Sequence, residues 1–350
     1  MSYANQDTVL LSRMTTRINT AETRLPKIRY AKGTMLGYGR YADVFEATDV
    51  DSGNLMAVKI LRRPPGTSEQ EWKMLLRGTR WREVKIHSQI SHPHIVNFIA
   101  SQGWDTGEVE TFIGLKEGSL QSLVSGGCSI DNLGPTVLYH MLQAIDFLAM
   151  QGIIHRDIKP ENILYESRAG QYHFQLGDFG FSDYEVAAKS PCGTWLYMAP
   201  EVFNRGKQTH RIDVWALYVT ILWTLDVGGF RKFRKRIRNH NEAVNTVLTL
   251  AANERQISDI QEMAKLNPEA RATAAQMLIK LYGGHGLTWF APLRCATSQQ
   301  SSDHGYPRVE TLSGAGHRMF PKADNSSHGR QPRRHQAAQS QAQTKPPWLP

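Results

Sequence analysis

The eight residues 155–162, with the sequence HRDIKPEN, bring together three side chains that could take part in one reaction. Asp157 could accept a proton from an attacking hydroxyl group, Lys159 could balance charge on a transferring phosphoryl group, and Asn162 could hold Mg²⁺ through its amide oxygen. The alternative is a polar surface turn, because Asp, Asn, Pro and Lys are all common in turns. His-Arg-Asp alone would be compatible with a turn, but the whole octet favours a catalytic loop.

A second short motif, Asp-Phe-Gly at residues 178–180, follows the octet, and Asp178 lies 178 − 157 = 21 residues after Asp157. Together with Leu164, these segments resemble the catalytic and metal-binding loops of the eukaryotic protein kinase family. The resemblance implies that Asp178 is a second metal ligand beside Asn162. It also implies that Leu164 contributes to nucleotide binding.

A segment containing glycines, residues 33–44, is predicted to form a strand, a turn and a returning strand. Gly37 and Gly39 would let backbone N–H groups approach phosphates closely. The alternative is an ordinary hairpin turn, because a single GxG is a weak signal and Ala42 stands where the family usually has a third glycine. The resemblance implies three further nucleotide-binding residues in this part of the chain, of which the second would cover the adenine: Leu36, Val44 and Ala57.

Lys59 lies within the apolar segment 55–61, where an unpaired ammonium group would be costly to bury. Similarity to the Val-Ala-Ile-Lys strand of the family implies that Lys59 binds the α and β phosphates of ATP and pairs with a helix carboxylate. The interval that the family uses before residues 92–96 implies that this partner is Glu83, in a helix that is predicted to begin with the capping box of Ser68 and Glu71. The alternative for Lys59 is an ordinary lysine at a sheet edge.

Further elements are expected to hold these loops in place. A helical stripe with Pro135 in its first turn leads toward the octet, and Asp213 opens an almost wholly apolar helix, which is typical of the buried centre of a lobe. His87 falls where the family usually has an apolar packing residue, so we expect a packed histidine. Arg271 resembles the family residue that pairs with the acid of an Ala-Pro-Glu triplet, here Glu201.

The resemblance covers residues 28–283 and implies an α+β, two-lobed protein kinase fold. A small antiparallel sheet with one main helix would form one lobe, a larger lobe would be mostly helical, and ATP and two Mg²⁺ would bind between them. Residues 1–27 are predicted to be a flexible extension. Residues 284–350 are predicted to be a disordered basic tail, because Ser, Gln, His, Gly and Pro dominate a composition that can bury little surface.

The composition limits the remaining classes of protein. The three cysteines are odd in number and show no C-x-x-C spacing, which disfavours a disulfide framework or a cysteine zinc site and favours a reducing compartment. The apolar cluster at residues 9–11 is too short for a signal peptide, and no run approaches the ~18 apolar residues of a membrane span. We therefore expect a cytoplasmic protein with no membrane partner, the nucleus being the alternative location.

The chain is basic, with a formal charge of 41 − 32 = +9. This charge affects solubility and association with partners, but it does not indicate a fold. Six cations occupy the eight positions of residues 231–238. Two interpretations of this run stay open: a solvated helix face, or a site for an acidic partner, nuclear import or nucleic acid. Nucleic acid is not an expected partner, since short basic runs are frequent false positives.

The activity implied by the resemblance is Mg²⁺-dependent transfer of the γ-phosphate of ATP to serine or threonine hydroxyls of protein substrates. Lys159 and Thr194 favour these acceptors, because tyrosine kinases usually have other residues at these places. The alternative is a pseudokinase or scaffold that uses the fold to bind partners. Its usual mark is loss of a catalytic residue, and this chain retains all four: Lys59, Asp157, Asn162 and Asp178. A small-molecule kinase, a third class, would not be expected to carry Glu201 and Arg271.

Arg156, directly before the predicted proton acceptor, needs an anion. In family members with this arginine, a phosphate on the activation loop commonly supplies the charge, and the corresponding position here is Ser190. We predict that Ser190 is phosphorylated, by an upstream kinase as a partner or by the chain itself. The alternative is that Arg156 pairs with a carboxylate such as Asp183 or Glu185.

Overall fold

The computed structural model describes residues 27–39, 41–127, 132–184 and 194–288, and every structural statement below refers to these residues. Almost all of the predicted N-terminal extension, most of the predicted tail, and the residues Glu185 and Ser190 lie outside them.

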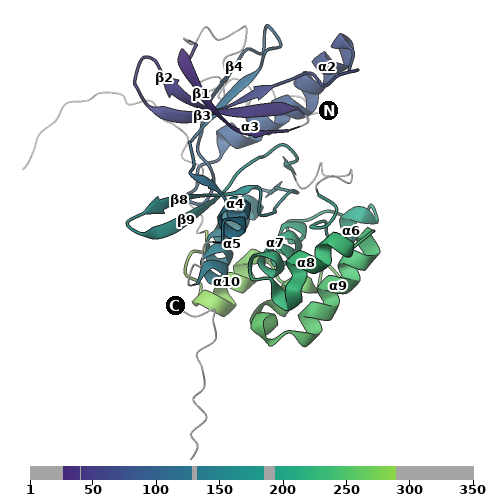
Figure 1. Ribbon diagram of the computed structural model, residues 1–350. Helices are drawn as coiled ribbons and strands as arrows, with labels where there is room; N and C mark the ends of the chain where they lie inside the picture. The colour runs from purple at the N-terminus through teal and green to yellow at the C-terminus, as the bar shows by residue number, and fades with distance from the viewer. Residues whose placement is uncertain (1–26, 40, 128–131, 185–193, 289–350) are drawn as a thin grey trace, which may run out of the picture. The chain divides into compact units, whose positions relative to one another are not determined.

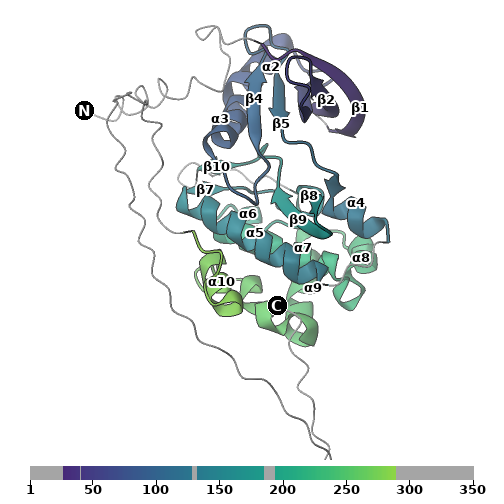
Figure 2. The same ribbon diagram turned by 90° about the vertical axis from the view of Figure 1, so that its left-hand side faces the viewer.

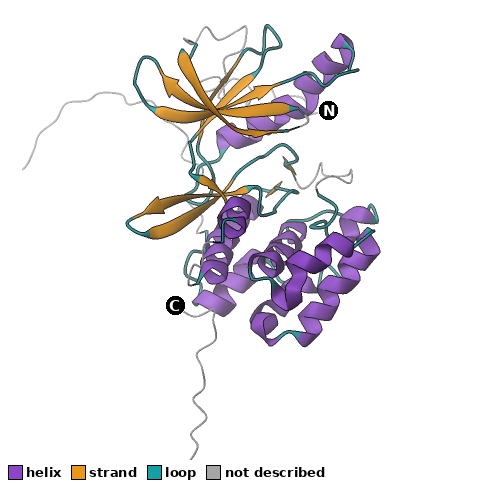
Figure 3. Ribbon diagram, in the orientation of Figure 1, coloured by secondary structure: helices purple, strands orange, loops and turns teal. Residues whose placement is uncertain are grey.

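A five-stranded antiparallel sheet with the order β1-β2-β3-β5-β4 forms the small lobe (Figures 1 and 3). Its strands are β1 (Tyr30–Tyr38), β2 (Ala42–Asp49), β3 (Leu55–Leu61), β4 (Phe98–Gln102) and β5 (Glu110–Ile113). The turn after β4 requires Gly103, because its φ is +81° and a Cβ there would lie 1.9 Å from the carbonyl oxygen of Glu108. The small antiparallel sheet predicted from the sequence is thereby confirmed.

The main helix of the small lobe has three parts: α2 (Glu69–Leu75), the π-helical segment η1 (Leu76–Arg80) and α3 (Trp81–Gln89). It begins with the predicted capping box, in which the Ser68 side chain accepts the N–H of Glu71 and the Glu71 carboxylate accepts the N–H of Ser68 at 2.8 Å. The π-helical turn contains Gly78, a weak helix former, and its wider spacing changes the direction in which the following side chains project.

The large lobe contains two small sheets. The first has the order β6-β8-β9 and the second pairs β7 with β10. Their strands are β6 (Gly118–Ser119), β7 (Ile153–Ile154), β8 (Ile163–Arg168), β9 (Gln171–Leu176) and β10 (Asp183–Tyr184). The loop of residues 155–162 is therefore fixed at both ends, because β7 ends directly before it and β8 begins directly after it.

Helices make up the rest of the large lobe, as predicted. They are α4 (Leu120–Ser125), α5 (Leu133–Met150), α6 (Pro200–Phe203), α7 (Arg211–Thr224), η2 (Val227–Gly229), α8 (Phe230–Phe233), η3 (Arg234–Arg236), α9 (His240–Asn253), η4 (Arg255–Ala264) and α10 (Ala274–Tyr282). α5 contacts β9, α7 and α10, and Figure 2 shows it running beside β9. Every residue of α7 from Ile212 to Thr224 is buried, which agrees with the expected central helix.

The basic run 231–238 divides into two kinds of cation. The guanidinium groups of Arg231 and Arg234 lie over the ring of Trp223, 5.9 and 5.4 Å from its centroid, so both take part in packing. The others are exposed: Lys232, Lys235, Arg236 and Arg238. The run is not one continuous helix face, since α8 and η3 are short and are followed by a loop.

The described chain continues for a few residues past the predicted domain end at residue 283. Leu287 packs on the large core, and the N–H of Thr288 donates to the Asp146 carboxylate at 2.8 Å. Among the described helices, no single one has both the length and the apolar composition to cross a membrane. One pair, 211–224 with 227–236, meets these two criteria together but is bent by 97°.

Candidate active site

Asp213, at the start of α7, holds the backbone of the predicted catalytic loop. Its carboxylate accepts the N–H of His155 at 2.8 Å and the N–H of Arg156 at 2.9 Å. Burial raises the pKa of the Asp213 carboxyl to about 6, against the effect of these two hydrogen bonds. Arg156 has a φ of +73°, an uncommon conformation for a residue with a Cβ, which the bonds to Asp213 help to maintain.

Both carboxylate oxygens of Asp157 accept hydrogen bonds in a nearly closed environment. Oδ2 accepts from Lys159 Nζ at 2.7 Å and from Asn162 Nδ2 at 2.9 Å. Oδ1 accepts from the backbone N–H and the hydroxyl of Thr194, both at 3.0 Å. The structure thus brings together the predicted proton acceptor, the predicted phosphate-directed cation and the predicted metal ligand of the octet. Thr194 joins them from the segment after the activation loop.

The predicted Lys59–Glu83 pair is present, and the ammonium group also contacts Asp178. Lys59 Nζ lies 2.5 Å from Glu83 Oε1 and 2.9 Å from Asp178 Oδ1. Burial opposes the charged form of Lys59, but the negative charges of Asp178 and Glu83 outweigh burial and raise its pKa. The positive charge of Lys59 is also the main reason why the pKa of Asp178 is lowered. Strand β3, helix α3 and the Asp-Phe-Gly motif therefore meet at one ammonium group.

Glu83 has a second cationic partner that the sequence analysis missed. Arg80, at the end of the π-helical segment, donates to Glu83 Oε2 at 2.9 Å, and its side chain is 10% exposed. The guanidinium group also lies 4.7 Å from the centroid of the Tyr41 ring, in the loop before β2. The spacing of three residues between Arg80 and Glu83 is a usual helical ion-pair spacing and could have indicated this contact.

A stack of rings connects α3 to the two loops. His87 stacks on Phe179 with ring centroids 4.6 Å apart, and Phe179 meets His155 edge to face at 4.9 Å. His87 Nε2 is 2.7 Å from the carbonyl oxygen of Val96, and burial lowers the pKa of its imidazole to about 4. His87 is therefore the packed histidine that was expected, and its low pKa keeps it neutral at pH 7.

The predicted nucleotide-binding residues lie mainly on the small sheet. In the strand register Gly37 is opposite Val44, and Val44 is opposite Lys59. The N–H of Gly39 donates to the carbonyl oxygen of Ala42 at 2.7 Å and so closes the turn between β1 and β2. The three others lie on different strands: Leu36 on β1, Ala57 on β3 and Leu164 on β8. Their roles toward ATP stay predictions.

The two predicted metal ligands have the oxygen donors that Mg²⁺ prefers. Asn162 uses its amide nitrogen to donate to Asp157, which leaves its carbonyl oxygen as the atom for a cation. The Asp178 side chain is 46% exposed, so a hydrated ion can approach it. Gly180 keeps this carboxylate uncovered, because a Cβ there would lie 3.1 Å from Asp178 Oδ1. The donors present therefore fit a magnesium ion.

The predicted pair of Glu201 and Arg271 is present in the large lobe. Arg271 Nη1 lies 2.5 Å from Glu201 Oε1, Nη2 lies 3.0 Å from Oε2, and the Arg271 side chain is fully buried. Arg271 also lies over Trp215 of α7 at 5.1 Å. This contact fixes α6, and with it the end of the segment that carries Thr194, to the core.

The Asp183 carboxylate lies near Arg156, as expected if a carboxylate, and not a phosphate on Ser190, is the anion beside Arg156. Asp183 Oδ2 lies 3.9 Å from Arg156 Nη1 and 3.1 Å from Arg82 Nη1 of α3. Ser190 and Glu185 lie outside the described residues, so the predicted phosphorylation stays a prediction.

Comparisons with known proteins agree with this geometry. A model of the family described as "Protein kinase domain" matches residues 30–282. The chain is 28% identical over 287 residues to "Calcium/calmodulin-dependent protein kinase type I" of Schizosaccharomyces pombe, an alignment that covers 73% of this chain and 79% of that protein. It is 28% identical over 215 residues to "CBL-interacting serine/threonine-protein kinase 20" of Arabidopsis thaliana, covering 59% of this chain and 47% of the relative.

A human relative, "Serine/threonine-protein kinase DCLK2", is 30% identical over 284 residues, covering 75% of this chain and 34% of that protein. The chain thus spans about half the length of the Arabidopsis relative and a third of the human one. The match to the family model does not depend on how much of each relative is covered, and its residues 30–282 include both lobes and every predicted site residue. The chain therefore belongs to the protein kinase domain family.

Proposed function

We propose that this chain is a serine/threonine protein kinase that transfers the γ-phosphate of Mg-ATP to hydroxyl groups of protein substrates. The observation that supports the proposal most strongly is the cluster around Asp157, where Lys159, Asn162 and Thr194 all donate to one buried carboxylate. A carboxylate in this position can accept the proton of a substrate hydroxyl group as its oxygen attacks phosphorus.

The other residues have positioning and electrostatic roles in this proposal. When bound, Mg²⁺ would neutralise charge on the nucleotide phosphates, and Asn162 and Asp178 would hold it. Lys59 would orient the α and β phosphates, and Glu83 keeps the ammonium group of Lys59 in place. Lys159 lies 2.8 Å from the Thr194 hydroxyl, so it connects the proton acceptor to the segment on which a substrate would lie.

The proposal is tested by phosphorylation of a peptide library with purified full-length chain and Mg-ATP. We expect incorporation at serine and threonine, and a loss of about 10² to 10⁴ in rate for Asp157→Ala, as is usual when a general base is removed. Lys59→Met should also lose most activity. Asp105→Ala and Lys232→Met are matched controls, because both side chains are exposed and lie outside the site.

Unchanged turnover in Asp157→Ala would rule out the assignment of Asp157. A folded wild-type chain that binds Mg-ATP without phosphorylating any peptide would instead favour the pseudokinase or scaffold alternative.

We propose that an anion beside Arg156 regulates the site, and two sources of this negative charge can be distinguished by experiment. Phosphorylation of Ser190, by an upstream kinase or by the chain itself, would supply a phosphate that suits a guanidinium group. The 3.9 Å contact with Asp183 supports the other source. Equal activity of wild type, phosphatase-treated wild type and Ser190→Ala, with no phosphate at Ser190 by mass spectrometry, would leave Asp183 as the anion.

We propose a cytoplasmic location, with the nucleus as the alternative, from the cysteine usage and the basic run. The exposed cations Lys232, Lys235, Arg236 and Arg238 are those available to an import receptor. Imaging of a fluorescent fusion before and after their replacement by alanine tests the alternative, because an import signal would be lost with them.

A further inference from the structure

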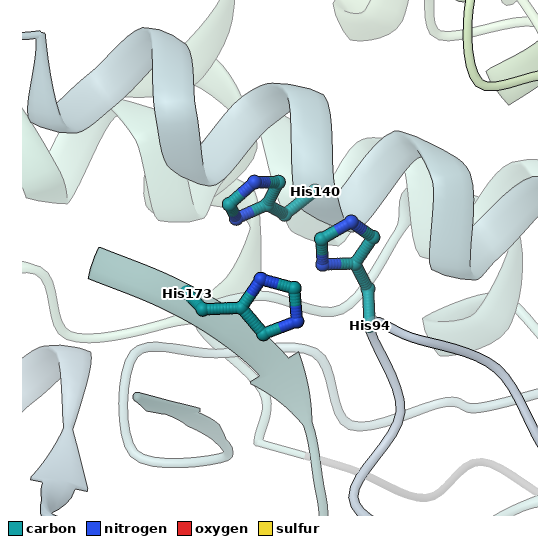
Figure 4. Close-up of side chains that lie close together, drawn as sticks. All are labelled: His94, His140 and His173. Carbon is teal, nitrogen blue, oxygen red and sulfur yellow. The ribbon is translucent and has the colours of Figure 1, made fainter. Parts of the chain in front are cut away.

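Three histidines from separate parts of the chain meet at the surface of the large lobe (Figure 4). His94 lies in the loop before β4, His140 on α5 and His173 on β9. One ring nitrogen from each lies within 4.8 Å of the other two. The ring centroids are 4.0 Å apart for His94 and His140, 4.6 Å for His94 and His173, and 5.2 Å for His140 and His173. The proposed kinase chemistry uses none of these side chains.

The surroundings keep two of these imidazoles in the neutral form that binds metals. Burial, and then the neighbouring His173, lower the pKa of His94 to about 4, although its bond to Phe174 works in the opposite direction. Burial, followed by His94 and His173, lowers the pKa of His140 to about 3. At neutral pH both rings therefore carry one proton and one nitrogen lone pair.

Hydrogen bonds to the backbone determine which nitrogen carries the lone pair in two of the rings. His94 Nδ1 lies 3.0 Å from the carbonyl oxygen of Phe174, and His173 Nε2 lies 3.0 Å from the carbonyl oxygen of Pro93. A carbonyl oxygen only accepts, so each of these nitrogens must carry the proton. Nε2 of His94 and Nδ1 of His173 are left with lone pairs, and a histidine that donates its other N–H to a backbone carbonyl is the usual arrangement of a metal ligand.

His140 is bound differently, and a metal would have to compete for it. Its Nδ1 accepts the backbone N–H of Phe174 at 3.2 Å, so the lone pair of this ring is directed at a donor. An ion at His140 Nδ1 would displace this one hydrogen bond from the backbone.

The rings must also turn before they can share an ion. In a tetrahedral zinc site with Zn–N of 2.0–2.1 Å, the ligand nitrogens are about 3.3 Å apart, and here the spread reaches 4.8 Å. The rings of His94 and His140 are stacked at 18°, so an ion cannot lie in both ring planes at once. His140 and His173 are only partly buried, which leaves their rings room to rotate and gives water access to a fourth position.

We propose that His94, His140 and His173 form a transition-metal site of the Zn²⁺ class, separate from the predicted Mg²⁺ ligands Asn162 and Asp178. Three imidazoles select Zn²⁺ and related ions over Mg²⁺, which prefers oxygen donors. The site joins the loop before β4, helix α5 and strand β9, and β9 leads into the Asp-Phe-Gly motif two residues after it ends. The structural alternative is that the rings only cap backbone groups at the edge of the β6-β8-β9 sheet, those of Phe174 by His94 and His140 and that of Pro93 by His173.

The test is a zinc titration of metal-free full-length chain in the presence of Mg²⁺, read by competition with a chromogenic chelator. Wild type should bind one equivalent of Zn²⁺ at this site. His140→Gln and His173→Gln should each lose that equivalent, or bind it with a Kd at least ~10-fold higher than that of wild type. Glutamine can still accept or donate at these positions, which keeps the backbone contacts. His285→Gln is the matched control, because His285 is exposed and outside the cluster.

Two further measurements separate a metal site from a structural cluster. Co²⁺ in place of Zn²⁺ should give the strong visible absorption of a four-coordinate ion in wild type and in His285→Gln, and lose it in His140→Gln. The unfolding temperatures of the metal-free variants should stay close to wild type, which shows that they fold. Equal zinc stoichiometry and affinity in wild type and in both folded variants would overturn the proposal and leave the capping role of the rings.

Discussion

Removal of the Glu201 carboxylate should destabilise the large lobe strongly, because it would leave a fully buried cation without its anion. Arg271 has no exposed side-chain surface, and both of its terminal nitrogens contact Glu201, at 2.5 and 3.0 Å. Three backbone carbonyls also accept from Arg271, those of Lys265 at 2.9 Å, Arg211 at 3.1 Å and Leu266 at 3.4 Å. In Glu201→Ala these carbonyls would remain, and the guanidinium charge would not be neutralised.

Breaking a buried ion pair by removing one partner costs ~3–5 kcal/mol. The backbone carbonyls and the ring of Trp215, 5.1 Å from the guanidinium group, would still stabilise the charge of Arg271. We therefore expect Glu201→Ala to lower the free energy of unfolding by about 3 kcal/mol, the lower end of this range. For a domain of this size 1 kcal/mol lowers the unfolding temperature by roughly 2–4 °C, so we expect a decrease of about 6–12 °C. The double variant Glu201→Ala with Arg271→Met should lose less, since it buries no charge.

Thermal unfolding followed by circular dichroism, with urea unfolding as a second assay, measures these differences. Glu269→Ala is the matched control, because Glu269 is 74% exposed and lies 3.9 Å from Arg211, a surface pair of ~0–1 kcal/mol. The reasoning is refuted if Glu201→Ala lowers the unfolding temperature no more than Glu269→Ala does. It is also refuted if the double variant is less stable than Glu201→Ala alone.

Three other expectations concern stability. Tyr218→Phe should raise the free energy of unfolding, measured in urea, by about 1 kcal/mol, because the buried Tyr218 hydroxyl has no partner among the described residues. Tyr282→Phe is the control and should bring no gain, because the Tyr282 hydroxyl donates to a carbonyl oxygen at 3.4 Å. Burial lowers the folded-state pKa of His87 from 6.5 to about 4, so the unfolded chain binds its proton first as the pH falls. From pH 7 to pH 5 wild type should therefore lose about 2 kcal/mol more stability than His87→Leu, and equal losses would contradict this. A chain ending at Thr288 should melt like the full chain, whereas one ending at Tyr282 should melt lower, since it lacks the packing of Leu287 and the hydrogen bond of Thr288.

Local patterns in the sequence were sufficient to predict the elements that carry the site. Strand β3 has the predicted bounds, because its apolar run is interrupted only by Lys59 and is followed by polar residues. That Lys59 needs an anion was predictable for a physical reason, since an ammonium group in a buried strand is costly without one, whereas the choice of Glu83 depended on the resemblance to the family. The capping box of Ser68 and Glu71 was also predictable, since it depends only on residues three apart.

The contacts that the sequence did not indicate join residues far apart in the chain. Asp213 is 58 positions from His155, and nothing in its neighbourhood indicates that it binds the loop backbone. The histidine cluster combines residues 94, 140 and 173, whose proximity depends on how α5 packs against β9. The π-helical segment at residues 76–80 also depends on tertiary packing, because helix propensity alone would give a regular α-helix.

The hydrogen bonds that Asp213 accepts from the backbone of the predicted catalytic loop should also affect the temperature at which the proposed activity is lost. They attach the loop to α7, whose amide groups should exchange with solvent only when the whole large lobe opens. Lys59 belongs to β3, whose apolar neighbours form clusters separate from the large core. In the proposed function, the proton acceptor Asp157 and the phosphate-binding Lys59 would therefore belong to two separately packed units, which we expect to open with different free energies. Turnover would need both units closed at once, so we expect activity to disappear at the temperature at which the less stable unit opens, before the bulk of the chain has unfolded.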